Sequence, residues 1–198
     1  MRRFTLSVFL AAAALLAGCA STWQVNSDVR TFSSLPAVPA GAVYRFERLP
    51  SQQSHGEQQA RLESVVEQSL AKVGLRRNDA AAKYSVQIGA RAQREASPWE
   101  DTWGGFGLPG RDYTVTGNGQ IIWLQPFSRP ELPWFRREVS VIMRDLANNQ
   151  VVYESQAMHE GRWADSNVLL PALFDSALSD FPKPTQGVKK VEVTVQLR

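Results

Sequence analysis

The pattern of apolar and polar positions predicts a chain built mainly from strands with one face in water. Alternation, which is typical of such strands, is strict over residues 84–93 and recurs over 135–145 and 191–197. Looser alternation predicts further strands over 23–32, 42–49 and 151–158. Asn148-Asn149 would turn one hairpin, and Gly117-Asn118-Gly119 would turn another between 114–116 and 120–124.

Two segments instead have apolar residues at helical spacing. The first carries a single stripe formed by Leu62, Val65, Val66, Leu70 and Val73. Ser54 and Glu57 match a capping box before it, and Gly74 is expected to end the helix. The second helix is predicted within 165–181. It should begin near Asn167, because Pro171 is tolerated only in a first turn.

This order of elements predicts an α+β or α/β fold, with a mixed, mostly antiparallel sheet and two helices packed on one face. Alternating strands have one wet face, so helices need cover only the other. No repeat or composition shift divides residues 23–198. We therefore expect one α/β domain over that range.

The first nineteen residues have a different character. Met1-Arg2-Arg3 is basic, residues 4–17 are almost continuously apolar, and small residues precede Cys19. This arrangement is typical of a secretory signal. The apolar run is shorter than the ~20 residues of a relaxed membrane span.

Leu16-Ala17-Gly18-Cys19 resembles the lipobox of bacterial lipoproteins, in which the chain is cut before a cysteine that becomes lipidated. The resemblance implies a signal peptide over 1–18, lipid on Cys19 and a tether over 19–22. Ala20 stands where an aspartate would mark inner-membrane retention in the enteric-type sorting rule. An outer-membrane anchor facing the periplasm is therefore implied. The alternative is an ordinary signal peptide with a stray cysteine, although Cys19 has no disulfide partner in the chain.

Charge gives no case for nucleic-acid binding. Loss of Arg2 and Arg3 reduces the 22 basic side chains to 20, against 19 acidic ones. A nucleic-acid interface would need a clustered basic face. Arg136-Arg137 and Lys189-Lys190 are expected to be solvated on strands.

No motif completes a catalytic, cofactor or metal site. His55 and His159 lack other ligands at zinc spacing and are expected to be structural or solvated. The pairs Glu63/Glu67 and Asp175/Asp180 fit the polar faces of helices. The glycines of 105–110 have dinucleotide-fingerprint spacing, but no strand precedes them and no helix follows. We therefore predict that the protein is not an enzyme and uses no cofactor.

One aromatic group is the candidate partner-binding site. Trp99, Trp103 and Phe106 lie in a segment rich in glycine and proline, and Trp134 could join them. They could plug the core, or they could form an exposed patch of the kind that marks a binding surface.

Several short strings resemble the bacterial envelope lipoproteins of the domain-of-unknown-function family numbered 4136. These strings lie at residues 43–46, 71–76, 84–87, 139–145, 151–154 and 177–182. The resemblance implies a fold and an envelope location but no activity. We therefore expect a non-catalytic module that binds an envelope protein or component. A module binding a small ligand or lipid is the alternative, and a hydrolase is the least favoured reading.

Overall fold

The structure is a computed structural model that describes residues 22–37, 41–95, 113–115, 117–123, 133–162 and 165–196. Its strands are β1 (Thr22–Ser33), β2 (Val43–Phe46), β3 (Arg76–Arg77), β4 (Tyr84–Glu95), β5 (Tyr113–Val115), β6 (Ile121–Trp123), β7 (Trp134–Asp145), β8 (Gln150–Gly161) and β9 (Lys189–Gln196). Its helices are α2 (Pro50–Gln53), α3 (Gly56–Lys72) and α5 (Ser166–Ala177).

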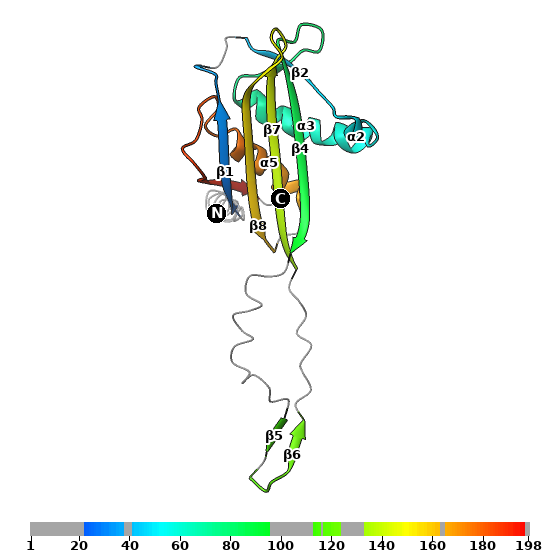
Figure 1. Ribbon diagram of the computed structural model, residues 1–198, viewed down its shortest axis with the longest axis vertical. Helices are drawn as coiled ribbons and strands as arrows, with labels where there is room; N and C mark the ends of the chain where they lie inside the picture. Colours follow the sequence, from blue (N-terminus) through cyan, green and yellow to red (C-terminus); the bar gives the residue numbers. More distant parts are fainter. Residues whose placement is uncertain are drawn as a thin grey trace, which may run out of the picture.

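Seven strands form one mixed sheet in the order β3-β2-β4-β7-β8-β1-β9 (Figure 1). The short β2 runs parallel to both β3 and β4, whereas the other pairings are antiparallel. Strands β5 and β6 pair only with each other, on either side of the predicted glycine turn. The fold is therefore α+β, with the mixed, mostly antiparallel sheet that the alternation predicted.

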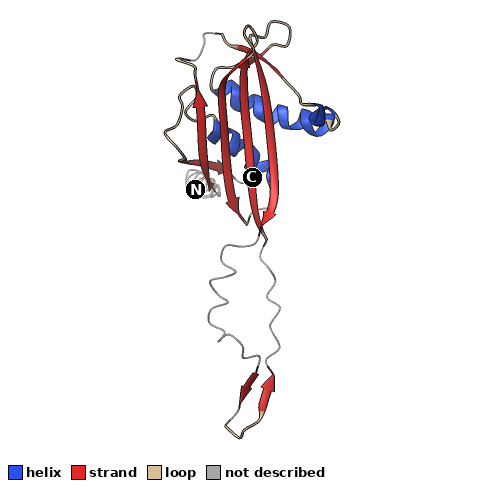
Figure 2. Cartoon of the chain, viewed as in Figure 1, coloured by secondary structure: helices blue, strands red, loops and turns tan. Residues whose placement is uncertain are grey.

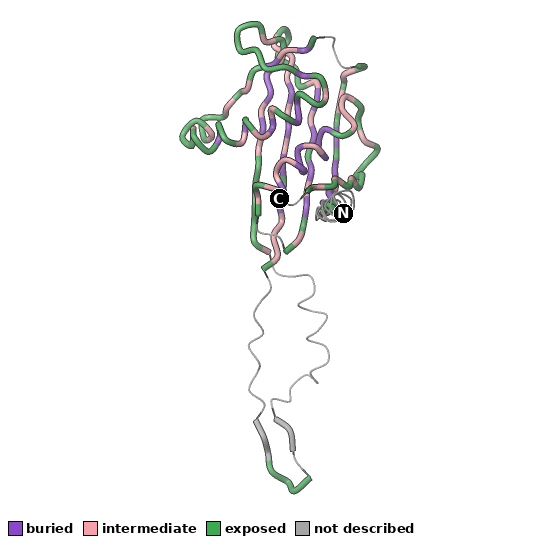
Figure 3. Tube along the Cα trace, turned by 180° about the vertical axis from the view of Figure 1, so that it is seen from behind, coloured by how far each residue is buried: buried purple, intermediate pink, exposed green. Residues whose placement is uncertain are grey.

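The two long helices, α3 and α5, lie behind the same face of this sheet (Figures 1 and 2). The buried residues are concentrated between the helices and the strands (Figure 3). The core includes Val86 and Ile88 of β4, Val141 of β7 and Leu173 and Phe174 of α5. Most side chains on the opposite face of the sheet are polar, as expected when helices cover only one side.

The C-terminal end of α5 is fastened to the sheet by hydrogen bonds. The carbonyl of Ala177 accepts from the Tyr153 hydroxyl at 3.0 Å and from the Ser155 hydroxyl at 2.6 Å. Ser155 also contacts the Thr31 hydroxyl at 3.0 Å. These bonds satisfy polar groups that would otherwise be buried without partners.

A second set of contacts joins the two long helices. Asp175 of α5 accepts from the Ser69 hydroxyl at 2.7 Å and from Lys72 Nζ at 2.6 Å, both on α3. Asp180, just after α5, accepts from Lys189 Nζ at 2.7 Å. These carboxylates therefore connect elements, beyond supplying a polar helix face.

Two charged residues expected at the surface are buried, so those expectations were wrong. Glu63 is 2% exposed and forms a two-bond ion pair with Arg48, with distances of 2.6 and 2.8 Å. Arg137 is also 2% exposed and packs over the ring of Phe135, 5.0 Å from its centre. Desolvation lowers the pKa of the Arg137 guanidinium. Glu63 lies on α3 and reaches Arg48, and Arg137 extends from β7 toward Ser166 of α5. Local pattern does not show which buried polar residues find such partners.

The helix starts also differ in part from expectation. The capping box is absent: His55, not Ser54, precedes α3, and its side chain caps no amide. The short helix α2, which was not predicted, occupies residues just before α3. The Ser54 hydroxyl donates to the Ser51 carbonyl of α2. In α5, Asp165 caps the Asn167 amide, and Pro171 lies inside the helix beyond its first turn. Gly74 has the positive φ expected of a helix stop.

Within the residues described, no helix combines the length and apolar character needed to cross a bilayer.

Candidate functional site

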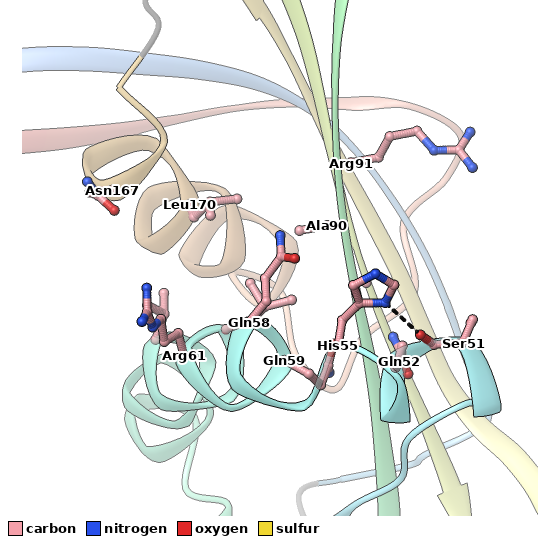
Figure 4. Close-up of a pocket in the computed structure, with 13 residues that line it drawn as sticks. Ser51, Gln52, His55, Gln58, Gln59, Arg61, Ala90, Arg91, Asn167 and Leu170 are labelled. Carbon is pink, nitrogen blue, oxygen red and sulfur yellow. Dashed lines mark hydrogen bonds between the residues drawn. The ribbon is translucent and has the colours of Figure 1, made fainter.

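A cleft of about 570 Å³ lies where α2, the first turns of α3, the start of α5 and β4 converge (Figure 4). Its polar lining comes mainly from amide, guanidinium and imidazole side chains: Gln52, His55, Gln58, Gln59, Arg61, Arg91 and Asn167. This volume is within the range of small-molecule and short-peptide sites. The cleft joins three separate stretches of the sequence: α2 with α3, β4 and α5.

One wall of the cleft is the part of β4 beyond Val86, where β2 no longer pairs with it. Pairing between β2 and β4 ends at Phe46 and Val86, because the chain leaves β2 for α2. The Val86 carbonyl still accepts from the Glu47 amide at 3.0 Å. The next carbonyl on that side, at Ile88, accepts from Gln52 Nε2 at 2.7 Å. The Gln52 side chain of α2 therefore takes the place of a strand amide at Ile88.

The opposite wall is the N-terminal part of α3. His55 stands at its start, with Nδ1 3.1 Å from the Ser51 carbonyl (Figure 4) and 3.0 Å from the Ser54 hydroxyl. Because no side chain caps this end, its first amides keep the partial positive charge of a helix N-terminus. Gln58 extends from α3 into the space between the helices and β4 (Figure 4).

Gln59 is the most unusual residue of the cleft. It is 7% exposed, and its Nε2 has no hydrogen-bond partner among the described residues. A buried donor without a partner costs roughly 1–3 kcal/mol of stability. Most buried polar groups have partners, so an exception needs an explanation. A ligand that supplies an acceptor would provide one.

Apolar side chains line the cleft between these polar walls. Leu62 and Val65 come from α3, and Leu170 comes from α5. The charged residues of the lining are Arg61 and Arg91, and the described lining contains no carboxylate. The cleft is therefore suited to a ligand with acceptor or anionic groups and some apolar surface.

The described part of the chain offers no metal site at this cleft. No group of three histidine, cysteine or carboxylate residues is arranged to hold a metal ion there. The side chains offered are amides, guanidinium groups and one imidazole, which suit recognition by hydrogen bonding.

The aromatic group predicted from sequence is only partly within the described residues. Trp99, Trp103 and Phe106 lie outside them, as does Cys19. Trp134 begins β7, pairs in register with Glu95 and is half-buried. The structure therefore does not bring Trp134 into the cleft.

His159 is 8% exposed, which fits the structural role predicted for it. Its Nδ1 lies 2.7 Å from the Asn26 carbonyl, and its ring packs edge-on against Trp23 at 6.0 Å. His55 is exposed at the start of α3, as its position before a helix predicted.

Sequence reasoning did not identify the cleft, although one signal was present. Gln59 and Glu63 precede Val66 and Leu70 at helical spacing, so they extend the apolar stripe of α3 toward its start. Polar residues on a buried stripe need partners. Glu63 has Arg48, whereas Gln59 has none for its Nε2.

Comparison with known proteins gave one family and several structures. The family described as "Domain of unknown function (DUF4136)" matches residues 23–183, a range that holds every string on which the resemblance was based. No curated protein matches the sequence. A crystal structure of a PDZ domain protein from Parabacteroides distasonis aligns with a TM-score of 0.52 at 13% identity.

That alignment covers 94% of this chain, which spans 42% of the length of the structure it matches. At this identity the likeness shows the fold alone. PelC dodecamers from Paraburkholderia phytofirmans align at 14% and 16% identity, with TM-scores of 0.41 and 0.40. Each covers 77% of this chain, and 95% and 96% of the respective PelC chains.

Proposed function

We propose, from the premise that the chain belongs to the DUF4136 family, that it is an outer-membrane lipoprotein whose periplasmic domain binds an envelope component without catalysis. The observation that carries the binding role is the cleft with the unpaired amide of Gln59. The family description assigns no activity, so the proposal depends on this chain's own residues.

The anchor is supported by the leader and by the position of β1. Cys19 lies three residues before Thr22, which begins β1. A chain spans at most ~3.6 Å per residue, so roughly 10 Å would separate the lipidated residue from the sheet. Each buried methylene of an acyl chain adds ~0.8 kcal/mol, and more than one chain makes attachment stable. The domain would therefore be held close to the bilayer.

Binding without catalysis is supported by the composition of the cleft. Its walls offer hydrogen-bond donors from Gln59, Gln58 and Arg61, while Leu62 and Leu170 provide apolar contact. Sites of this kind fix a ligand's orientation through a few polar groups set in apolar surface. We infer that the cleft recognises a partner by shape and hydrogen bonding.

The anchor is tested by replacing Cys19. In the wild type we expect the protein in the outer-membrane fraction, with a mature N-terminal peptide whose mass includes acyl chains. Cys19→Ser should abolish acylation and release the protein from that fraction. A wild-type N-terminus cut elsewhere and free of lipid would contradict the proposed anchor.

The binding role is tested by cross-linking in intact cells. A photoreactive residue replaces Gln58 in the cleft, and a matched control replaces Gln156, which is exposed on the opposite face of the sheet. We expect a specific product from position 58 that is absent from position 156. Equal products from both positions, or none from position 58 in stably present protein, would contradict binding at the cleft.

The same experiment separates the two classes of occupant. Peptide in the product indicates a protein partner. A lipid or other small molecule would favour the alternative function, a ligand-binding module, for which the apolar lining of Leu62, Val65 and Leu170 is the supporting observation.

A further inference from the structure

We infer that the occupant of the cleft is an extended, acidic peptide segment of a partner protein, which binds as an additional strand on the open edge of β4. This inference rests on the proposed binding function and specifies the chemistry of its ligand. The structural basis is the position of an unpaired strand edge beside a donor-rich cleft.

The backbone direction of β4 follows from two hydrogen bonds. The carbonyls of Val86 and Ile88 both point away from β7, toward the Glu47 amide and Gln52 Nε2. Alternate residues of a strand direct their backbone groups to the same side. The register between β4 and β7 is unbroken from Tyr84 to Glu95. The amides and carbonyls of Ala90 and Ala92 therefore also point to the open side.

These groups have no strand beside them in the described part of the chain. The pairing with β2 stops at Val86, and Gln52 reaches only Ile88. Gly89, Ala90 and Arg91 line the cleft, so its space adjoins the unpaired edge directly. An added strand lies about 4.8 Å from its neighbour, and strand addition on such edges is a common mode of peptide recognition.

The charges around the edge favour an acidic peptide. Arg61 and Arg91 line the cleft, and Arg94 follows on the same strand. Arg61 forms an ion pair with Glu57, but it is a long one, at 4.0 Å, between two highly exposed side chains. Such pairs interact weakly in water. Arg91 faces Glu138 across the ladder, on the side of β4 away from Ala90 (Figure 4).

The helix side of the cleft has the same preference. The start of α3 has no side-chain cap, so its dipole attracts acceptors and anions. Gln59 supplies the independent observation, because its Nε2 is a buried donor that a carbonyl or carboxylate oxygen would satisfy. Leu62 and Leu170 can then receive the side chains on one face of the added strand.

The test uses three synthetic heptapeptides on the mature, lipidated protein in detergent. The first alternates valine with glutamate, the second replaces each glutamate with lysine, and the third is the first with alternate backbone nitrogens methylated. Binding is measured by fluorescence anisotropy. We expect the acidic peptide to bind at least about tenfold more tightly than either of the others.

A pair of variants tests the strand edge itself. Ala92→Pro removes an amide that points to the open side, where proline is tolerated on an edge strand. Ala92→Val keeps that amide and serves as the control. We expect the proline variant to weaken binding about tenfold and the valine variant to leave it nearly unchanged, with circular dichroism confirming both folds.

Three outcomes would overturn the inference: no binding of the acidic peptide at roughly 1 mM, equal binding of the lysine peptide, or equal binding by the proline variant. Each would leave the proposed function standing if the cross-linker at position 58 still gave its specific product. Loss of that product as well would overturn both.

Discussion

At the scale of single residues, buried polar groups distinguish the parts that stabilise the fold from the part that we propose binds a ligand. Tyr153 and Ser155 share the Ala177 carbonyl, and Glu63 is paired with Arg48. Gln59 is also buried, but its Nε2 has no partner among the described residues. Groups of the first kind stabilise the fold, whereas an unpaired group lowers stability. At Gln59, the proposed ligand would supply the missing acceptor.

Replacing Gln59 should therefore separate stability from binding. Gln59→Leu removes the unpaired donor at similar volume, so we expect a free energy of unfolding unchanged or higher by about 1 kcal/mol. The specific cross-link from position 58 should be lost. Urea unfolding and the cross-linking assay measure the two effects.

Gln52→Leu is the matched control, because Gln52 Nε2 donates to the Ile88 carbonyl at 2.7 Å. Its loss should destabilise the protein by about 1 kcal/mol. A Gln59 variant that is as destabilised as the Gln52 variant would mean that Gln59 serves the fold.

Two buried tyrosines should respond differently to loss of the hydroxyl. Tyr153 donates to the Ala177 carbonyl, while the Tyr44 hydroxyl has no partner among the described residues. We expect Tyr153→Phe to cost about 1 kcal/mol and Tyr44→Phe to be neutral or stabilising. Urea unfolding of both variants at neutral pH tests this, and equal losses would contradict it.

The same tyrosines should make the fold sensitive to alkali. Burial raises the pKa of both hydroxyls above the usual 10.0. Because the folded pKa is the higher one, the folded state holds more protons above about pH 10, and stability falls as pH rises further. Each tyrosine contributes at most about 1.4 kcal/mol per pH unit. Between roughly pH 10 and 11, the free energy of unfolding should fall less in Tyr44→Phe than in the wild type. An equal fall in both proteins would contradict this account.

At the scale of elements, alternation and helical spacing predicted the longer strands and both long helices. They did not predict α2 or β3, since four and two residues are too few to show a period. The capping box failed for a related reason: α2 occupies the residues before α3. The local pattern of residues shows which face of an element is apolar. It does not show the direction of the chain between elements, because tertiary contacts decide that direction.

The two candidate caps give a direct comparison. Asp165 accepts from the Asn167 amide at 2.8 Å at the start of α5, whereas the Ser54 side chain does not cap the start of α3. Asp165→Ala should cost about 1 kcal/mol and Ser54→Ala much less. Since Asn167 lines the cleft, the Asp165 variant should also weaken binding. Thermal unfolding of both proteins measures the difference, and equal losses would argue against this assignment of the cap.

At the scale of the whole molecule, the cleft combines segments that no local pattern relates. Both long helices cover one face of the sheet (Figures 1 and 4). This arrangement brings together the junction of α2 and α3, the middle of β4 and the start of α5. The short β2 leaves β4 unpaired where this corner stands. The anchor implied at Cys19 would hold this cleft within reach of other envelope components.

The most direct test of the central claim is hydrogen exchange of the lipidated protein in isolated outer membranes, compared with the same protein purified in detergent. If the cleft is occupied in the envelope, amides of residues 89–95 and of the first turns of α3 should exchange at least about tenfold more slowly in membranes. Residues 150–158 should exchange alike in both samples. Equal exchange of β4 in the two samples would contradict the claim that this cleft is where the protein binds.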